Sequence, residues 1–211
     1  MVKNEQENGM IKLYCFPRSG NSREVKLVLA EKGIAFEPIN VHAEGFNKED
    51  ADFKKASPGG KVPAIIDGST YMSEAYKINE YLDEKYPKNP ILPKDAAKRA
   101  EIAQWVAKYD KSLILKIGLL LIECILKPKE QQKEETKVRL RGEITAGLRE
   151  LNSFLKGKEY FFGAYSLADV SVTPHLTVLG RLQVEIPADC SDLRAWLERI
   201  RARSNFKSSE N

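Results

Sequence analysis

The segment that most constrains the fold is Gly59-Gly60-Lys61-Val62-Pro63-Ala64-Ile65, which is followed by Ser73-Glu74-Ala75 at the start of an amphipathic stretch. A proline between a glycine pair and an apolar run favours a turn that enters a strand, and a cis Val62-Pro63 bond would expose the main-chain N–H and C=O of Val62 to a ligand. Glu74 is expected at a helix start, where a carboxylate and unbonded N–H groups can bind the amine and carboxylate of a small zwitterion. The spacing therefore predicts a turn that holds a peptide.

The chain up to residue 86 alternates strand and helix patterns. Strands are expected at residues 10–16, 36–41, 62–67 and 70–72, and helices at residues 22–32, 48–56 and from 75 to near 87. Ser22 could cap the first helix, Gly33 closes it, and Asp67-Gly68 marks a hairpin turn. The order β-α-β-α-β-β-α predicts an α/β domain over residues 10–86.

Residues 87–94 contain three prolines and no periodicity, which is typical of a linker between domains. The remaining segment, residues 95–206, carries apolar residues at helical spacing throughout. It includes a long stripe over residues 97–126 and a Ser166-Leu167-Ala168-Asp169 helix-start signal. We therefore expect an all-α second domain.

Charge and cysteine content exclude several classes of function. The net charge of +4, from 34 basic and 30 acidic residues, is spread without a basic block, so nucleic-acid binding is not indicated. Cys15, Cys124 and Cys190 are far apart in the sequence and form no Cys-x-x-Cys or Cys/His cluster. The sequence therefore predicts no metal site and no disulfide framework, and it fits a reducing cytoplasm.

Membrane insertion is not indicated either. Residues 1–9 are polar and lack the apolar core of a secretory signal, so they are expected to form a loose tail. Residues 113–126 form the most apolar run, but it is short for a bilayer span and contains Lys116 and Glu123. We expect this run to be a buried helix.

Over about residues 10–206 the chain resembles the cytosolic glutathione S-transferases, with a zeta- and theta-like serine-type motif. The resemblance rests on four stretches in a fixed order: Leu13-Tyr14-Cys15-Phe16-Pro17-Arg18-Ser19, Ser57-Pro58-Gly59-Gly60-Lys61-Val62-Pro63-Ala64, Glu74 with Ile78, Tyr81, Leu82 and Tyr86-Pro87, and Ser166-Leu167-Ala168-Asp169. It implies a thioredoxin-like N-terminal domain and an all-α C-terminal domain. It also implies a cytoplasmic detoxification enzyme that joins the glutathione thiolate to a small hydrophobic electrophile. Glutathione would be a co-substrate, with no further cofactor, and the protein would be a homodimer.

The resemblance places Ser19 beside the glutathione sulfur. A free thiol has a pKa near 8.5, and lowering it by about two units needs roughly 2.7 kcal/mol of preferential thiolate stabilisation. One hydroxyl hydrogen bond and the positive end of a helix can supply this energy, so Ser19 would donate a hydrogen bond to the thiolate. Without the resemblance, Ser19 would be interpreted as a turn or cap residue. Asn21 and Ser22 are alternative donors.

The glutathione-binding positions of the family fall on Lys61, Val62 and Glu74. By resemblance, Val62 would pair with the cysteinyl backbone, Glu74 would face the γ-glutamyl end, and Lys61 would lie near the glycyl end; alternatively, Lys61 and Glu74 are ordinary surface charges. Ala75 departs from the family, which commonly has a serine that contacts the γ-glutamyl carboxylate. A lost hydrogen bond to a charged group costs about 1.5 to 3 kcal/mol, which would weaken binding roughly ten- to hundredfold unless Ser73 compensates.

By resemblance, the pocket for the second substrate would lie between the two domains, lined by the first loop and by the first helices of the C-terminal domain. Trp105, Tyr109 and Ser112 on the long helix are candidates. Aromatic residues at this spacing more often belong to a core. Ser166 and Asp169 are expected to cap a helix and not to act in catalysis.

Two other functions stay open at this stage. Ala75 would suit a non-catalytic relative that acts through protein association. A thiol oxidoreductase would use Cys15 in a mixed disulfide with glutathione. The position of Cys15 within a strand favours a small buried hydrophobe over that redox role.

Overall fold

The computed structural model describes residues 9–208, so most of the predicted N-terminal tail lies outside the described residues. The chain forms two compact units, one of residues up to Ile91 together with the chain from Ser204 onward, and a second of Leu92–Arg203. The exact boundaries of the predicted domains, 10–86 and 95–206 with a linker at 87–94, stay a prediction.

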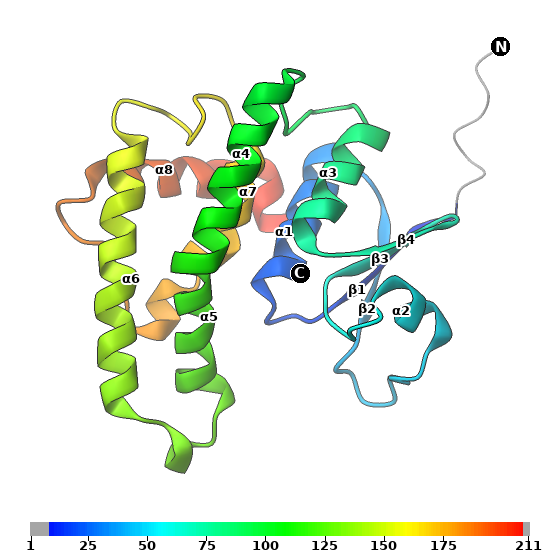
Figure 1. Cartoon of the computed structure of the whole chain (residues 1–211), viewed down its shortest axis with the longest axis horizontal. Helices are drawn as coiled ribbons and strands as arrows, with labels where there is room; N and C mark the ends of the chain where they lie inside the picture. The colour runs from blue at the N-terminus through cyan, green and yellow to red at the C-terminus, as the bar shows by residue number, and fades with distance from the viewer. Residues whose placement is uncertain (1–8, 209–211) are drawn as a thin grey trace. The chain divides into compact units, whose positions relative to one another are not determined.

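The first unit is built on a four-stranded mixed sheet (Figure 1). Its strands are β1 (Ile11–Cys15), β2 (Phe36–Asn40), β3 (Ala64–Asp67) and β4 (Thr70–Ser73), in the order β2-β1-β3-β4. β1 runs parallel to β2 and antiparallel to β3, and β3 and β4 form the predicted hairpin. This arrangement confirms the α/β N-terminal domain.

Helices cover both faces of this sheet. α1 (Gly20–Lys32) packs against α3 (Ala75–Lys85) on one face, and the short α2 (Ala51–Ala56) lies on the other face. Under α2 a cluster of buried side chains joins the helix to β1 and β3, namely Tyr14, Val41, Phe53, Ala56, Ala64 and Ile66. The Asp50 carboxylate caps α2 by accepting from the Phe53 amide at 2.7 Å and also accepts from the Tyr14 hydroxyl at 3.3 Å.

The start of α1 differs from the prediction. The N-cap is Ser19 and not Ser22, because the Ser19 hydroxyl oxygen accepts from the Ser22 amide at 3.2 Å. Gly33 ends the helix in the left-handed conformation with φ 66°, as glycine at that position does most easily. The helix therefore begins directly at the residue that the resemblance assigns to glutathione.

The second unit is helical. It contains α4 (Ala96–Tyr109), α5 (Leu115–Leu121), α6 (Glu134–Leu155), α7 (Leu167–Leu176) and α8 (Ser191–Ala202). α4 and α5 form one long helix interrupted by a π-helical segment at Asp110–Ile114 and followed by another at Ile122–Leu126. Short 3₁₀ turns occupy Lys129–Gln131 and Leu179–Leu182. These elements confirm the all-α C-terminal domain.

An aromatic cluster fills the core of this unit. The Trp105 ring lies 4.4 Å from Tyr109 and 4.6 Å from Phe161, measured between ring centroids. Trp105 and Tyr109 are 7% and 3% exposed. The structure therefore places both aromatic candidates for the second-substrate pocket in the core. Ser112 donates to the Lys108 carbonyl within its own helix.

The helix-capping role of Asp169 is confirmed. One carboxylate oxygen accepts from the Ser166 amide at 2.9 Å and from the Ser166 hydroxyl at 3.0 Å. The other accepts from the Phe161 amide at 3.2 Å and from the Trp196 indole at 2.9 Å. Burial raises the pKa of Asp169 to about 6, and these donors act against that rise. Asp169 thus ties α7 to α8.

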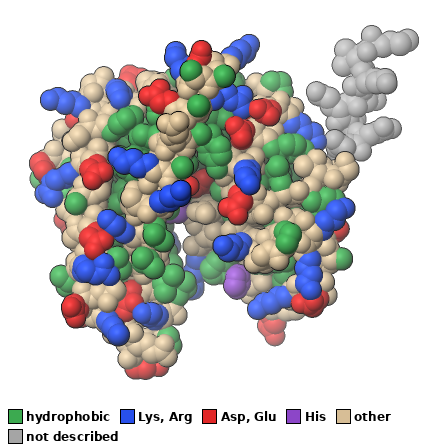
Figure 2. Space-filling view, viewed as in Figure 1, with side chains coloured by type: hydrophobic (Ala, Val, Ile, Leu, Met, Phe, Trp, Pro, Cys, Tyr) green, Lys and Arg blue, Asp and Glu red, His purple; other side chains and the backbone are tan. Residues whose placement is uncertain are grey.

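The charges are intermingled on the face shown in Figure 2, where acidic side chains lie among the lysines and arginines. None of the helices in the described part of the chain is long and apolar enough to span a membrane.

Candidate functional site

The sheet register brings three sequence motifs to one edge of the first unit. Tyr14 of β1 lies opposite Ala64 of β3, and Ala64 lies opposite Ser73 of β4. β1 therefore ends where β3 begins and where β4 ends. The loop to Ser19, the turn at Val62 and the residue Glu74 all leave the sheet at this edge.

Ser19 is half-buried at the start of α1, and its main chain is fixed on both sides. Its amide donates to the Phe16 carbonyl at 2.9 Å, and its carbonyl accepts from the Arg23 amide at 3.1 Å. The Ser19 hydroxyl oxygen accepts from Ser22, and within residues 9–208 no acceptor takes the hydroxyl proton. The hydroxyl can therefore donate to a ligand while it caps the helix.

The two alternative donors are placed differently. Ser22 is 1% exposed, and its hydroxyl oxygen accepts from the Phe16 amide at 3.4 Å, so it holds the loop from inside. Asn21 is exposed on the first turn of α1. Burial thus removes Ser22 as a donor to an external ligand, whereas Asn21 remains accessible.

The Val62-Pro63 peptide bond is cis, the form in which the sequence analysis expects the main chain of Val62 to face a ligand. Val62 precedes the ladder, which begins at Ala64, and none of the hydrogen bonds found among the described residues uses its main chain. The main-chain N–H and C=O of Val62 are therefore available to an extended peptide.

Ser57 stabilises this turn through hydrogen bonds, a role that the sequence did not indicate. It is 2% exposed, its hydroxyl oxygen accepts from the Lys61 amide at 3.0 Å, and its carbonyl accepts from the Gly60 amide at 2.9 Å. Gly60 has φ 64°, a left-handed conformation that glycine adopts without a steric penalty. A Ser-Pro-Gly-Gly sequence indicates a turn, but it does not indicate that the serine hydroxyl closes it.

Glu74 is the N-cap residue of α3 and has φ 76° and ψ 114°. A non-glycine residue with positive φ is uncommon and strained, and such residues cluster at ligand sites. The side chain of Glu74 is exposed, and no side chain caps α3. The Glu74 carboxylate and a first helical turn without a side-chain cap thus lie at the same end of α3.

Lys61, Ser73 and Ala75 complete this edge. Lys61 is exposed, Ser73 is half-buried at the end of β4, and Ala75 is 9% exposed as the first residue of α3. The structure therefore brings all the predicted glutathione-binding residues of the first unit to one edge of the sheet. It also places the Ala75 methyl group where the resemblance leads us to expect a serine hydroxyl.

A buried carboxylate anchors α3 to the hairpin. Asp67, 1% exposed, accepts through one oxygen from the hydroxyls of Tyr81 and Tyr86 at 2.9 and 2.8 Å and from the Lys85 ammonium at 2.8 Å. Burial and the Asp67 charge raise the pKa of Tyr86 to about 12. The pKa of Lys85 is raised because these partners outweigh its desolvation. These contacts fix the orientation of α3, whose first turn lies at the candidate site.

Cys15 is the last residue of β1 and is 3% exposed. Burial raises the pKa of its thiol, and the charge of Lys26 acts in the opposite direction. A buried thiol with a raised pKa is a poor nucleophile, so the geometry disfavours a redox role for Cys15. In the described part of the chain no group of three or more metal-ligating side chains is found.

Both units match known protein families. Residues 13–90 match the model for the N-terminal domain of glutathione S-transferase, and residues 113–204 match the model for its C-terminal domain. Glutathione S-transferase Z1 of Arabidopsis thaliana is 33% identical over 180 residues, which cover 83% of this chain and 80% of that protein. The chain belongs to the glutathione S-transferase family.

Other relatives of this family member carry different names. Maleylacetoacetate isomerase of Rattus norvegicus is 31% identical over 82% of this chain and 80% of that protein. A stringent starvation protein A homolog of Coxiella burnetii is 27% identical over 96% of this chain and 92% of that protein. A glutathione transferase structure from Burkholderia graminis, described with two glutathione molecules bound per subunit, has 27% identity and a TM-score of 0.79 and covers 95% of this chain and 87% of its own.

Proposed function

We propose that this protein is a glutathione-dependent transferase that joins the glutathione thiolate to a small hydrophobic electrophile. The observation that carries the proposal is the Ser19 hydroxyl, whose oxygen is occupied by the Ser22 amide and whose proton has no acceptor among the described residues. Glutathione is the co-substrate, and the proposal needs no further cofactor.

Ser19 and the start of α1 would stabilise the thiolate together. The hydroxyl donates its hydrogen bond to sulfur, and the positive end of the helix dipole favours the negative charge. The thiolate then attacks an electrophilic carbon. Either a halide leaves with its bonding electrons, or the thiolate adds to a double bond and the neighbouring carbon takes up a proton.

The remaining edge residues would hold the tripeptide. The main chain of Val62 pairs with the cysteinyl residue, the Glu74 carboxylate binds the γ-glutamyl ammonium, and Lys61 attracts the glycyl carboxylate. The first-turn amides of α3 face the γ-glutamyl carboxylate, because helix N-termini bind anions. Asn21 supplies a second polar contact near the sulfur.

An isomerase reaction would use the same thiolate. Reversible addition to a conjugated cis double bond produces a single bond that can rotate before the thiolate leaves again. The name of the rat relative motivates this variant. An assay panel should therefore contain an activated aryl halide, an α,β-unsaturated ketone and maleylacetoacetate.

The test compares Ser19→Gly with Ser19→Thr. Glycine is only a few tenths of a kcal/mol worse than serine as an N-cap, so Ser19→Gly removes the hydroxyl and leaves α1 nearly as stable. We expect the pKa of bound glutathione, followed by thiolate absorbance, to rise by about one to two units and kcat/KM to fall roughly ten- to hundredfold. Ser19→Thr keeps the hydroxyl and should retain activity within a few-fold. Equal thiol pKa values in both variants would contradict the role of Ser19.

Ala75 favours a second candidate, a non-catalytic protein that acts through association with another protein. The methyl group removes one expected ligand contact, and the Coxiella relative is named as a stringent starvation protein. Calorimetry with millimolar glutathione separates the two candidates. Binding supports the transferase, whereas its absence in a folded protein supports the association protein.

Two further properties are proposals based on the family. We expect a homodimer, which sedimentation equilibrium would detect as twice the chain mass. We also expect the protein to act in the cytoplasm, where glutathione is present.

A further inference from the structure

The helical unit contains a cavity of about 470 Å³. It is bounded by the end of α7, the 3₁₀ turn at Leu179–Leu182, the segment 184–186 and α8. Its volume lies within the usual range of about 300 to 1,000 Å³ for small-molecule sites. None of the residues assigned above to glutathione lines it.

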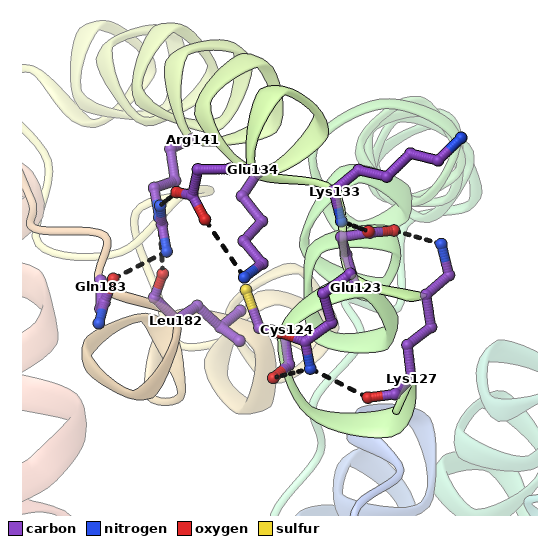
Figure 3. Close-up of polar contacts among 10 residues, drawn as sticks. Glu123, Cys124, Lys127, Lys133, Glu134, Arg141, Leu182 and Gln183 are labelled. Atoms are coloured by element: carbon purple, nitrogen blue, oxygen red, sulfur yellow. Dashed lines mark hydrogen bonds and ion pairs between the residues drawn. The ribbon is translucent and has the colours of Figure 1, made fainter. Parts of the chain in front are cut away.

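Residues 184–186 form one wall of the cavity, and the two residues directly before them, Leu182 and Gln183, are held by Arg141 of α6 (Figure 3). The Arg141 guanidinium donates to the Leu182 carbonyl at 3.1 Å and to the Gln183 side-chain oxygen at 2.8 Å. Gln183 has φ 56°, a conformation that a non-glycine residue keeps only when its surroundings fix it. The cavity is therefore largely pre-formed.

The floor of the cavity is apolar. Leu176, Leu179, Val184 and Leu197 line it and are between 2% and 5% exposed. Such a surface favours the burial of an aliphatic side chain of a ligand, because both apolar surfaces are then removed from water. The floor thus selects an apolar group.

Four charged side chains line the same cavity, and two of them neutralise each other. Arg201 pairs with Glu198 at 2.9 Å. Arg194 donates to the Ile186 carbonyl at 2.9 Å, which fixes its guanidinium at the wall, but it forms no ion pair with any residue in the 9–208 range. Glu185 likewise has no cationic partner there. One positive and one negative charge therefore remain for a ligand.

We propose that this cavity binds a zwitterion with an apolar body, namely a short apolar peptide. The peptide carboxylate pairs with Arg194, its ammonium pairs with Glu185, and an aliphatic side chain occupies the floor. A dipeptide reaches about 7 Å in extended form, so its two charged termini are far enough apart to pair with two different side chains. A simple fatty anion would leave Glu185 unpaired and would feel its repulsion. The inference does not rest on the proposed transferase activity.

A ligand series tests each element of this proposal on the full chain. Leucyl-leucine carries both charges and the apolar body, N-acetyl-leucyl-leucine lacks the ammonium, leucyl-leucine amide lacks the carboxylate, and seryl-serine lacks the apolar body. Amide chemical shifts in nuclear magnetic resonance titrations locate binding and give Kd. The titrations are repeated with saturating S-hexylglutathione, so that a peptide at Val62 is recognised separately.

We expect leucyl-leucine to shift signals of residues 176–201 whether or not S-hexylglutathione is present. Exposed ion pairs are worth about 0.2 to 1 kcal/mol, so removal of either charge should weaken binding up to about fivefold. Seryl-serine should bind at least tenfold more weakly than leucyl-leucine.

Variants of the lining complete the test. A Cβ at Gly180 meets no atom within 4 Å and Gly180 has no positive φ, so a larger side chain is tolerated there. Because Gly180 lines the cavity, Gly180→Phe should occupy part of it and weaken the binding of leucyl-leucine at least tenfold. Arg194→Gln and Glu185→Gln should each weaken the binding of leucyl-leucine up to about fivefold. Arg181→Gln, an exposed arginine that does not line the cavity, is the matched control and should change nothing.

Three results would overturn the proposal. Chemical-shift changes confined to the first unit would show that the peptide binds outside this cavity. Tighter binding by N-acetyl-leucyl-leucine or by Glu185→Gln would show a site for a simple anion. Unchanged affinity in folded Gly180→Phe would show that the cavity is not the binding site.

Discussion

Introducing a hydroxyl at position 75, in Ala75→Ser, should tighten glutathione binding. Ala75 is the first residue of α3, it is 9% exposed, and no side chain caps the helix. A serine hydroxyl there could donate to the γ-glutamyl carboxylate, and a hydrogen bond to a charged group contributes about 1.5 to 3 kcal/mol. Burying the hydroxyl in the unliganded protein costs about 1 kcal/mol. The net gain of about 0.5 to 2 kcal/mol corresponds to a roughly two- to thirtyfold lower Kd for Ala75→Ser.

Isothermal titration calorimetry with glutathione measures this change directly. Ala96→Ser is the matched control, because Ala96 is also the first residue of a helix, α4, but belongs to the other unit. Its Kd should equal that of the unchanged protein. An Ala75→Ser variant that is fully folded and binds glutathione no more tightly would refute the placement of the γ-glutamyl carboxylate at α3.

Three further predictions concern the turn and the buried charges. Ser57→Ala removes the acceptor for the Lys61 amide and should raise the glutathione Kd and lower the free energy of unfolding by about 1 kcal/mol, as calorimetry and urea unfolding will show. Burial lowers the pKa of His175 from 6.5 to about 4, so the unfolded chain takes up the proton first and stability is lost as the pH falls from 6.5 towards 4. That loss is about 2 kcal/mol between pH 8 and pH 5, and His175→Gln should abolish it in urea titrations at the two pH values. Lys32→Met leaves the Asp83 carboxylate buried without its 2.6 Å partner and should cost about 3 to 5 kcal/mol by urea unfolding.

Each of these measurements has a comparison that isolates its cause. Lys54→Met breaks an exposed pair with Glu49 and should change stability by less than about 1 kcal/mol, so equal losses in Lys32→Met and Lys54→Met would contradict the role of burial. For His175, an unchanged pH dependence in the variant would assign the acid loss to other groups. For Ser57, unchanged glutathione affinity would separate the hydroxyl from the shape of the Val62 turn.

The sequence predicts the local features of the site better than its backbone geometry. The glycine pair before Val62 and the hairpin residues Asp67-Gly68 have specific turn chemistry, and the structure has turns at both. Glu74 has positive φ, which its side chain does not signal. That conformation depends on the hairpin before it and the anchored helix after it, which are tertiary effects.

Two errors of the sequence-based prediction arise because a local sequence pattern fits more than one backbone arrangement. Ser19 and Ser22 are both good N-cap residues, and only the packing of the loop decides that Ser22 turns inward and Ser19 begins the helix. The long apolar stripe predicts one regular helix over residues 97–126, whereas the structure interrupts it with π-helical segments such as Asp110–Ile114. The period of the apolar residues does not distinguish these two helix types over so few residues.

The last helix of the described residues, α9 (Ser204–Ser208), belongs to the first unit. Phe206 is 8% exposed and lies 5.0 Å beneath the Arg23 guanidinium of α1, and Asn205 donates to the Glu31 carboxylate at 3.2 Å. During synthesis, residues up to Ile91 therefore leave the ribosome long before the segment that covers α1 is available. The N-terminal unit can reach its final packing only after the whole helical unit has been made, so a fragment that ends near Ile91 would expose the surface that Phe206 covers.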